Sequence, residues 1–493
     1  MKQKYSGRDG LLIRPSVAKE LLSKSIARTF KKGGVNVASY ETERLSHYHG
    51  KSMVHKVRLG FEFPAEVFDV PPVVVVKTYS DEPLNVNDYM AERGMLELSE
   101  ALTCRDGDRT VRVYPRYFSG EVPECIPYRT LIREYVPQDS LMKIVLEKRG
   151  RRENVRWTDI NGTISPIALL HTNSPWLEEN LGNEITRFSK EYLSENLFKH
   201  IERIARFSGN IISEDLRDHI INNLQFAIGK YLFGEHLNSV INGDLSVCPH
   251  HTTNSILLDA GGTCVGPITD DLSLYSDPLF EGVLDENGHP MDLQERGKAS
   301  VREYVDKRKR FAGILHYPNN VEERLRKDFI LASWFVAGMR GNIRGASSAL
   351  CYKYSDSVDT KKNADVAPTS WNPRMNVPVL GQPTNIPLEY LEQEVKNYIH
   401  NVLDIMKILR AEDGQLFGAL ESLIRQALPE DFRINRSVAG KLINGLKEKL
   451  SRSARPAVER NSNRFRDGRR TQPIKTVKDL QTEKGTGSLG LQT

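Results

Sequence analysis

The sequence lacks a long hydrophobic run and has few cysteines. No apolar stretch in its 493 residues approaches the length of a membrane-spanning helix, and the N-terminal MKQKYSGRDG lacks the apolar segment of a secretory signal. The five cysteines are odd in number, scattered, and free of C-x-x-C spacing, which argues against a disulfide framework and against a zinc knuckle. We therefore expect a cytoplasmic protein with reduced thiols and no membrane partner.

An excess of one charge sign is also missing from most of the chain. The net charge is +5, but residues 451–493 hold ten Lys and Arg against four Asp and Glu, so this tail accounts for the whole excess. The tail has almost no apolar periodicity, which predicts disorder. Nucleic-acid contact through its arginines stays an alternative, whereas the rest of the chain has no basic excess to support such contact.

Hydrophobic periodicity divides the chain into four parts. Residues 1–40 are predicted to be an extension with one helix, over PSVAKELLSKSIARTF. Residues 41–136 contain alternating and β-branched segments and one helix, NVNDYMAERGMLELSEAL, which indicates a small β-rich lobe. Residues 137–450 form a larger helical lobe with an insertion around 345–387, and 451–493 form the tail. The predicted class is α+β with two lobes.

The larger lobe shows four clear helical patterns and one strand signal. The helices are expected over residues 177–206, 212–233, 321–340 and 388–411. The segment SILLDAGGTCVGPITDD predicts a hairpin, with two short strands joined by an Ala-Gly-Gly turn.

Charged residues of several segments follow one another in an order suited to phosphoryl transfer. Lys77 ends the run VVVVK, Glu92 lies on the next predicted helix, and Asp244 lies in NGDLS. Asn254 precedes ILLD, and acidic residues close the predicted hairpin. Transfer from ATP requires a cation on the phosphates, a carboxylate that holds this cation, oxygen ligands for Mg²⁺, and an Asp near the acceptor hydroxyl. The chain contains one candidate for each requirement.

Three further segments carry a resemblance to a known family. EYVPQDSL resembles the family's E-Y-L-x-G-x-S-L, SPIALLH its helix ending in L-x-x-L-H, and SDPLFE its G-D-P-L-Y-D. Taken in order over roughly residues 41–340, these segments resemble the aminoglycoside phosphotransferase and choline kinase family. The resemblance implies a bilobal protein-kinase-like fold and an ATP- and Mg²⁺-dependent kinase that phosphorylates a hydroxyl of a small molecule.

The resemblance also implies roles for single residues. Lys77 would contact the phosphates and pair with Glu92, and Glu97 is the alternative partner. Asp244 would be the catalytic Asp. Backbone groups of the hinge residues Glu134 and Val136 would bind the adenine edge. The metal would be bound by Asn254 and Asp270, with Asp271 as runner-up. A loop with a single glycine, containing Ser46, Gly50 and Ser52, would lie at the phosphates.

The catalytic loop departs from the family pattern. The family has five residues from Asp to Asn, whereas Asp244 and Asn254 are ten apart, which indicates an insertion of about five residues within SVCPH. Asn242 replaces the family's first His, and Thr269 occupies the usual position of the metal-binding Asp. Three alternatives therefore stay open: a nucleotide-binding pseudokinase or scaffold, a protein kinase, and a metal site on Cys248, His250 and His251. The acceptor and the oligomeric state are not specified by these patterns.

Overall fold

A computed structural model describes most of the first 444 residues. The predicted tail, Ser46, Gly50, Cys248 and His250 lie outside the described residues. The described ranges are 15–30, 35–45, 52–62, 70–79, 83–118, 129–182, 185–233, 238–246, 251–315, 327–353, 371–372, 377–378 and 388–444.

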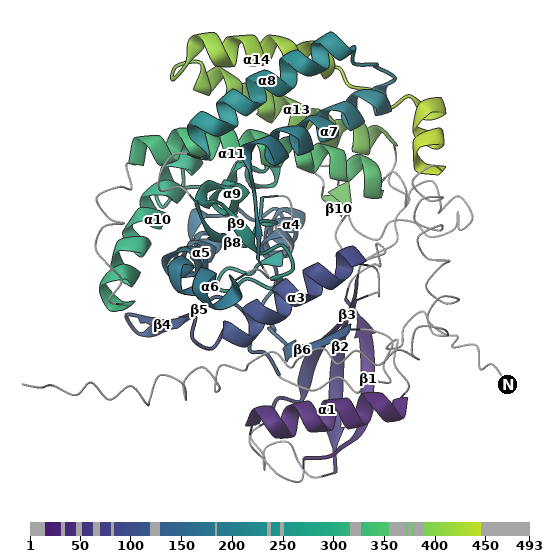
Figure 1. The fold of residues 1–493 in the computed structure, drawn as a ribbon, viewed down its shortest axis with the longest axis vertical. Coiled ribbons are helices and arrows are strands. Elements are labelled where there is room, and N and C mark those ends of the chain that lie inside the picture. The colour runs from purple at the N-terminus through teal and green to yellow at the C-terminus, as the bar shows by residue number, and fades with distance from the viewer. Residues whose placement is uncertain are drawn as a thin grey trace, which may run out of the picture. The chain divides into compact units, whose positions relative to one another are not determined.

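The N-terminal lobe is built on a four-stranded antiparallel sheet of order β1-β2-β3-β6 (Figure 1). Its strands are β1 (Val37–Arg44), β2 (Ser52–Phe61), β3 (Val73–Tyr79) and β6 (Arg129–Glu134). β3 is buried along almost its whole length, which explains its unbroken β-branched run. β1 begins inside the predicted extension, so the lobe starts slightly earlier than expected.

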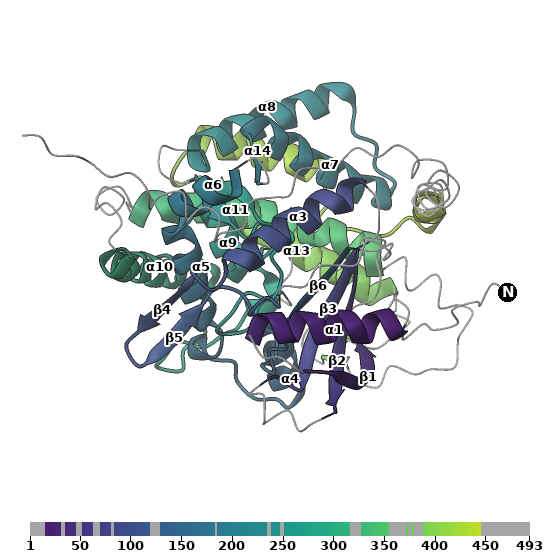
Figure 2. The same ribbon diagram turned by 60° about the horizontal axis from the view of Figure 1, so that its bottom comes forward.

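Two helices flank this sheet. α1 (Pro15–Phe30) lies across it and buries Leu21, Leu22 and Ile26 in a small core with strand residues such as Val57 and Val74. α3 (Pro83–Leu98) is the predicted helix of the lobe, and both views place it between the sheet and the helical lobe (Figure 2). A hairpin of β4 (Thr103–Asp106) and β5 (Arg109–Arg112) follows it.

The C-terminal lobe is mainly helical, as predicted, so the α+β two-lobe class is confirmed. Its helices are α4 (Leu141–Gly150), α5 (Ile164–Thr172), α6 (Ser174–Leu181), α7 (Lys190–Ser208), α8 (Glu214–Tyr231), α9 (Ile268–Leu272), α10 (Leu293–Leu315), α11 (Lys327–Ser348), α13 (Leu388–Leu409) and α14 (Gly414–Ala427). Short 3-10 helices cover Trp157–Asp159, Asn161–Thr163, Ser273–Ser276 and Pro278–Phe280, and a π-helical turn covers Ala349–Lys353. The strands are β7 (Thr186–Arg187), β8 (Asn238–Ile241), β9 (Cys264–Pro267), β10 (Trp371–Asn372) and β11 (Val377–Pro378).

α10 and α14 are among the helices that the apolar pattern did not predict. α10 carries many charges, yet Asp292 and Glu295 begin it with a reciprocal pair of hydrogen bonds in which each side chain accepts from the other's backbone N–H, at 2.7 and 2.8 Å. Its buried face includes Tyr304 and Phe311. α14 is capped by Asp413, whose carboxylate accepts from the Leu416 amide at 3.1 Å. The capping residues therefore mark where both helices begin, and α14 also has a clear apolar face of Leu416, Phe417, Leu420 and Ile424.

Three expectations about elements are corrected. The helix expected over 177–206 is two helices, because Gly182 adopts φ +52° and Thr186–Arg187 pair with β9. β9 does not pair with the preceding ILLD segment; it pairs antiparallel with β8, with Ile241 opposite Cys264. Residues 345–353, placed in a loop insertion, continue α11 and form its π-helical turn. Within the described residues, no helix is both long enough and apolar enough to cross a membrane.

Candidate active site

Lys77 is the centre of a buried charge network between the two lobes. It lies in β3, where it is opposite Val54 of β2 and Leu131 of β6, and its side chain is 5% exposed. Its Nζ donates to Glu92 Oε2 at 2.7 Å and to the two carboxylate oxygens of Asp259 at 2.8 and 3.0 Å. The predicted Lys77–Glu92 pair is thus present, and a second carboxylate joins it from the helical lobe.

The electrostatics of this network favour the charged forms of its members. Burial alone would lower the pKa of Lys77, but the charges of Asp259 and Glu92 outweigh it and raise the pKa above its usual range. Burial would raise the pKa of Asp259, yet Lys77, His251 and Arg133 hold it far below its usual range. In this network the cations Lys77 and Arg133 balance the carboxylates of Glu92 and Asp259. The Asp259 side chain is 20% exposed, so its carboxylate is the one that a bound cation can reach.

Glu92 is fixed by more than Lys77. Its side chain is fully buried in α3, where Tyr79 donates its hydroxyl to Glu92 Oε2 and Arg133 lies 3.6 Å from Oε1. Glu97, the alternative partner, instead pairs with Arg93 on the exposed side of the same helix, at 2.8 Å. Glu97 is five residues beyond Glu92, which turns its side chain roughly 140° around the helix axis, so Glu92 is the one of these two residues that contacts Lys77.

Asp244 follows β8 on a loop that two glycines make possible. Gly243 has φ +81°, and a Cβ there would lie 2.5 Å from the Gly262 carbonyl oxygen. A Cβ on Gly262 would lie 2.5 Å from Asp244 Oδ2, so this glycine makes room for the carboxylate. The Asp244 side chain is 41% exposed and contacts Arg344 at 3.4 Å.

The turn Ala260-Gly261-Gly262 brings Asp244 and Asp259 to neighbouring positions. A Cβ on Gly261 would lie 3.2 Å from Asp259 Oδ1, whereas the next residue, Gly262, adjoins Asp244. Consecutive Cα atoms are about 3.8 Å apart, so the two carboxylates border the same short stretch of backbone. Asn242 strengthens this contact because its amide donates to the Asp259 carbonyl oxygen at 2.5 Å. Because the two glycines have no side chains, space is left between the carboxylates of Asp244 and Asp259, whose oxygens are suitable metal ligands.

The Asp271 side chain holds the loop that carries Asp244, through hydrogen bonds from the backbone amides of this loop. Its two carboxylate oxygens accept from the amides of Asn242 and Gly243, at 2.7 and 2.9 Å. His171 Nε2 lies 3.1 Å from Asp271 Oδ2, and because a carboxylate only accepts, this nitrogen carries the proton. His171 Nδ1 then accepts from the Tyr304 hydroxyl at 2.9 Å. Burial lowers the pKa of His171 despite Asp271, so the imidazole is neutral and acts as a fixed spacer.

The two residues expected to bind the metal are engaged in other contacts. Asn254 Oδ1 accepts from the Gly162 amide at 2.7 Å, and its amide nitrogen donates to Thr158 O at 3.3 Å. Asp270 is 2% exposed in α9 and forms an ion pair with Arg340. The physical reason is the β8–β9 pairing, which places Ile268–Leu272 in a helix that packs under the catalytic loop. Neither side chain is bonded to the Lys77 network, and the runner-up Asp271 holds backbone instead.

Of the two residues expected at the hinge, Glu134 is the last residue of β6 and Val136 comes two residues later. The Glu134 amide donates to the Arg116 carbonyl oxygen at 2.8 Å, so only its carbonyl oxygen could accept from adenine. Its carboxylate is bonded to Arg112 at 2.6 Å and to the Arg116 amide at 3.1 Å. Val136 is half-buried just after the strand. Ser46 and Gly50 lie outside the described residues, as does the side chain of Ser52, whose backbone opens β2.

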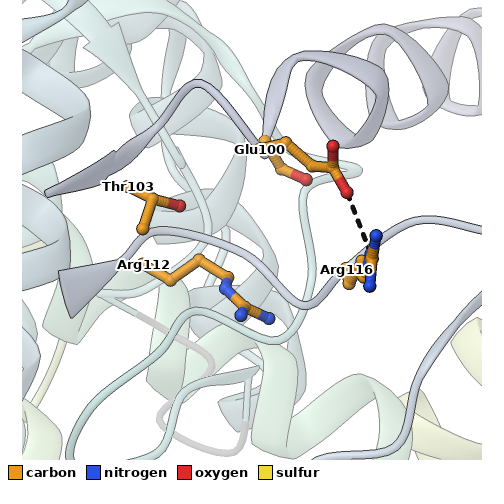
Figure 3. A pocket seen from close by; sticks show the side chains of 5 residues that line it. Glu100, Thr103, Arg112 and Arg116 are labelled. Carbon is orange, nitrogen blue, oxygen red and sulfur yellow. Dashed lines mark hydrogen bonds and ion pairs between the residues drawn. The ribbon is translucent and has the colours of Figure 1, made fainter. Parts of the chain in front are cut away.

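A small depression lies beside this hinge and is distinct from the Lys77 network (Figure 3). Arg116 Nε donates to Glu100 Oε1 at 2.9 Å on its rim, and Arg112 faces it from the opposite side. Its lining residues are Ser99, Glu100, Thr103, Arg112 and Arg116. Since it contains neither Lys77 nor Asp244, it is not the candidate active site.

Sequence reasoning missed Asp259, and it considered His251 only as part of a metal site with Cys248 and His250. Asp259 ends the apolar run SILL and is followed by Ala-Gly, a pattern similar to the D-F-G triplet whose Asp binds Mg²⁺ in protein kinases. His251 Nε2 is 3.9 Å from Asp259 Oδ2. Among the described residues, no group of three or more His, Cys, Asp or Glu side chains is arranged to hold a metal. A Mg²⁺ ion in a phosphotransfer site requires fewer protein ligands than this, because one or two carboxylates bind it together with the substrate phosphates.

Comparisons with known proteins gave similarity at the level of solved structures. No family model matches the sequence, and no curated protein matches it either. A choline kinase from Cryptosporidium parvum Iowa II is 12% identical, with 83% of this chain and 99% of that chain covered and a TM-score of 0.45. An aminoglycoside 2′-phosphotransferase in a GDP complex is 12% identical, with 70% and 95% covered and a TM-score of 0.39. A macrolide 2′-phosphotransferase from Brachybacterium faecium is 14% identical, with 70% and 99% covered and a TM-score of 0.34. The chain is therefore similar, at low identity, to structures of small-molecule phosphotransferases.

Proposed function

We propose that this protein is an ATP- and Mg²⁺-dependent phosphotransferase that acts on a hydroxyl of a small molecule. The observation that carries the proposal is the joining of three parts: Lys77 between two carboxylates, Asp259 reaching Lys77 from the helical lobe, and the half-exposed Asp244 on the neighbouring loop. A buried cation held by carboxylates, together with a further carboxylate that solvent can reach, matches the groups that phosphoryl transfer requires.

The chain's residues fit the nucleotide and metal in defined ways. Lys77 would bind phosphate oxygens while Glu92 keeps its ammonium in position, and Asp259 would hold the metal with help from His251. The metal and nucleotide together supply the transferable phosphoryl group and neutralise its charge. The Glu134 carbonyl oxygen and the Val136 amide would bind the adenine edge. Asn254 and Asp270 are not part of this proposal, because their side chains are bonded elsewhere.

Asp244 would act on the acceptor. Its carboxylate would accept the proton of the hydroxyl as the acceptor oxygen bonds to the γ-phosphorus of ATP and the bond from this phosphorus to the oxygen of the departing ADP breaks. Asp271 would keep the Asp244 loop in place through the two backbone amides, and His171 and Tyr304 would keep Asp271 in place. These residues position the base, and none of them contacts the acceptor.

The test compares Asp244→Asn with the control Asp404→Asn, an exposed position on α13. Nucleotide turnover is measured with ATP and GTP, Mg²⁺ and a panel of hydroxylated metabolites, and label entering polypeptide is measured in parallel. We expect about 10²- to 10⁴-fold less turnover in Asp244→Asn and unchanged nucleotide-dependent thermal stabilisation. Stabilisation by Mg²⁺-nucleotide without any turnover above Asp244→Asn would instead support a pseudokinase, and label in polypeptide a protein kinase.

A further inference from the structure

The surroundings of Asp244 on the helical lobe are positively charged. Arg344 of α11 lies 3.4 Å from Asp244 Oδ1 and is 18% exposed. Arg340, one turn earlier on the same helix, is 3% exposed and paired with Asp270. Arg203 of α7 approaches the same helix, with its guanidinium 3.2 Å from Ser347 Oγ. Arg344 thus contacts the proposed catalytic carboxylate, and Arg340 and Arg203 lie close enough to Arg344 that all three charges act on His200.

Packing fixes this cluster in place. A Cβ on Gly341 would lie 3.1 Å from the Ser246 Cβ, so α11 rests directly on the loop that carries Asp244. His200 Nδ1 lies 3.0 Å from the same Ser347 hydroxyl that Arg203 contacts. Burial, together with the charges of Arg344, Arg203 and Arg340, lowers the pKa of His200 to about 3, so this His is neutral and adds no charge. The cations are therefore held by the fold and not by chance surface proximity.

The arginines have too few carboxylate partners. Arg340 is neutralised by Asp270, but Arg344 has only Asp244, and Arg203 forms no carboxylate ion pair within the described part of the chain. The Arg203 side chain also contacts Cys351. Burial and the neighbouring Arg344 lower the pKa of Arg340 to about 9, which still leaves it charged at neutral pH. A partly buried guanidinium without a carboxylate is a binding group for an external anion.

We propose that the acceptor is a hydroxyl compound that carries a carboxylate or phosphate group, which binds to Arg344 and Arg203. This inference rests on the proposed function for the role of Asp244. A cationic acceptor such as an amino sugar or choline would meet like charge beside its reacting hydroxyl, and juxtaposed like charges disfavour binding. An anionic group would instead be drawn to the arginines and would turn its hydroxyl toward Asp244.

Binding of the anion is tested first, because it does not depend on turnover. Inorganic phosphate is titrated calorimetrically into the full-length protein saturated with Mg²⁺-ADP, so that the nucleotide site is filled. Arg344→Gln and Arg203→Gln are each expected to weaken phosphate binding about tenfold or more, which corresponds to ~1.4 kcal/mol. The control Arg206→Gln alters an exposed arginine of α7 paired with Glu202 and should change nothing. Arg344→Lys retains the charge and should restore part of the affinity.

Turnover then distinguishes the acceptor classes. Four related compounds are compared: glucosamine as cation, glucose as neutral compound, gluconate as carboxylate, and glucose 6-phosphate as phosphate. We expect turnover with the two anionic compounds, gluconate and glucose 6-phosphate, and a KM about tenfold higher in Arg344→Gln than in wild type. The ratio of kcat/KM for these two compounds distinguishes a carboxylate from a phosphate group.

Three results would overturn the inference. The first is a preference for glucosamine, and the second is phosphate affinity that is equal in wild type, Arg344→Gln and Arg203→Gln. The third is a weakened affinity for ADP in Arg344→Gln with unchanged phosphate affinity, which would assign Arg344 to the nucleotide. If no compound is turned over but phosphate binding depends on both arginines, the proposed activity fails and the anion site stands.

Discussion

The exchange of Asp259 for Asn tests which carboxylate belongs to the site. Asn has nearly the same shape as Asp, so the variant removes charge and leaves packing intact. Lys77 would lose its bonds of 2.8 and 3.0 Å to Asp259 but keep Glu92 at 2.7 Å, so the ammonium is not left unpaired. Since a hydrogen bond to a charged group contributes roughly 1.5–3 kcal/mol, we expect the free energy of unfolding to fall by about 2 kcal/mol.

The assay measures thermal and denaturant unfolding with ATP and a Mg²⁺ titration. A nucleotide present at a hundredfold excess over its Kd stabilises the folded protein by about 2.7 kcal/mol. In Asp259→Asn, we expect the part of this stabilisation that depends on Mg²⁺ to be lost. Asn254→Ala is the matched comparison, because it removes hydrogen bonds of 2.7 and 3.3 Å and should lower baseline stability by about 1 kcal/mol without changing the Mg²⁺ response.

The reverse pattern would refute the reasoning. If Asn254→Ala abolished the Mg²⁺ response and Asp259→Asn retained it, the metal would belong with Asn254, as the family resemblance implies. Loss of the response in both variants would mean that the hairpin between them must be intact for binding, and Asp259 would lose its special role.

Three further predictions follow from other parts of the site. Gly262→Ala places a Cβ 2.5 Å from Asp244 Oδ2, so turnover should fall at least tenfold while nucleotide binding persists. The control Gly440→Ala has open space around the added Cβ and should leave turnover unchanged in the same assay. The pKa of His200 is lowered to about 3, whereas in the unfolded chain it is about 6.5, so the free energy of unfolding should decrease as pH falls from 6.5 toward 3; in His200→Asn, urea titrations should show this slope reduced by about one proton. Asp271→Asn leaves one buried backbone amide facing an NH₂ group and should cost about 3 kcal/mol of stability, seen in urea unfolding; unchanged stability would show that the loop has another support.

Much of the fold could be predicted from local patterns. The β-branched run before Lys77, the helix that carries Glu92, and the amphipathic helices of the larger lobe all bury one surface that recurs at a regular period along the chain. The errors came from features with weak periodicity. α10 has a charged sequence and was missed although its capping residues are local, and the helix predicted over 177–206 is interrupted because β7 pairs with β9, which no local pattern reveals.

The candidate site divides in the same way. The sequence by itself determined the two lobes, Lys77 in a strand and Glu92 on the following helix, because each depends on residues within a few positions of it; β8, which precedes Asp244, was not predicted. Tertiary structure alone decided which of the later acidic residues reaches Lys77, since Asp259 lies 182 positions away and several carboxylates were equally plausible. The antiparallel pairing of β8 with β9 places Asp259 at the glycine turn beside Asp244. The same pairing places Asp270 and Asp271 in α9, which follows β9. The charge around Asp244 was decided in the same way, because Arg203 and Arg344 come together only when α7 and α11 pack.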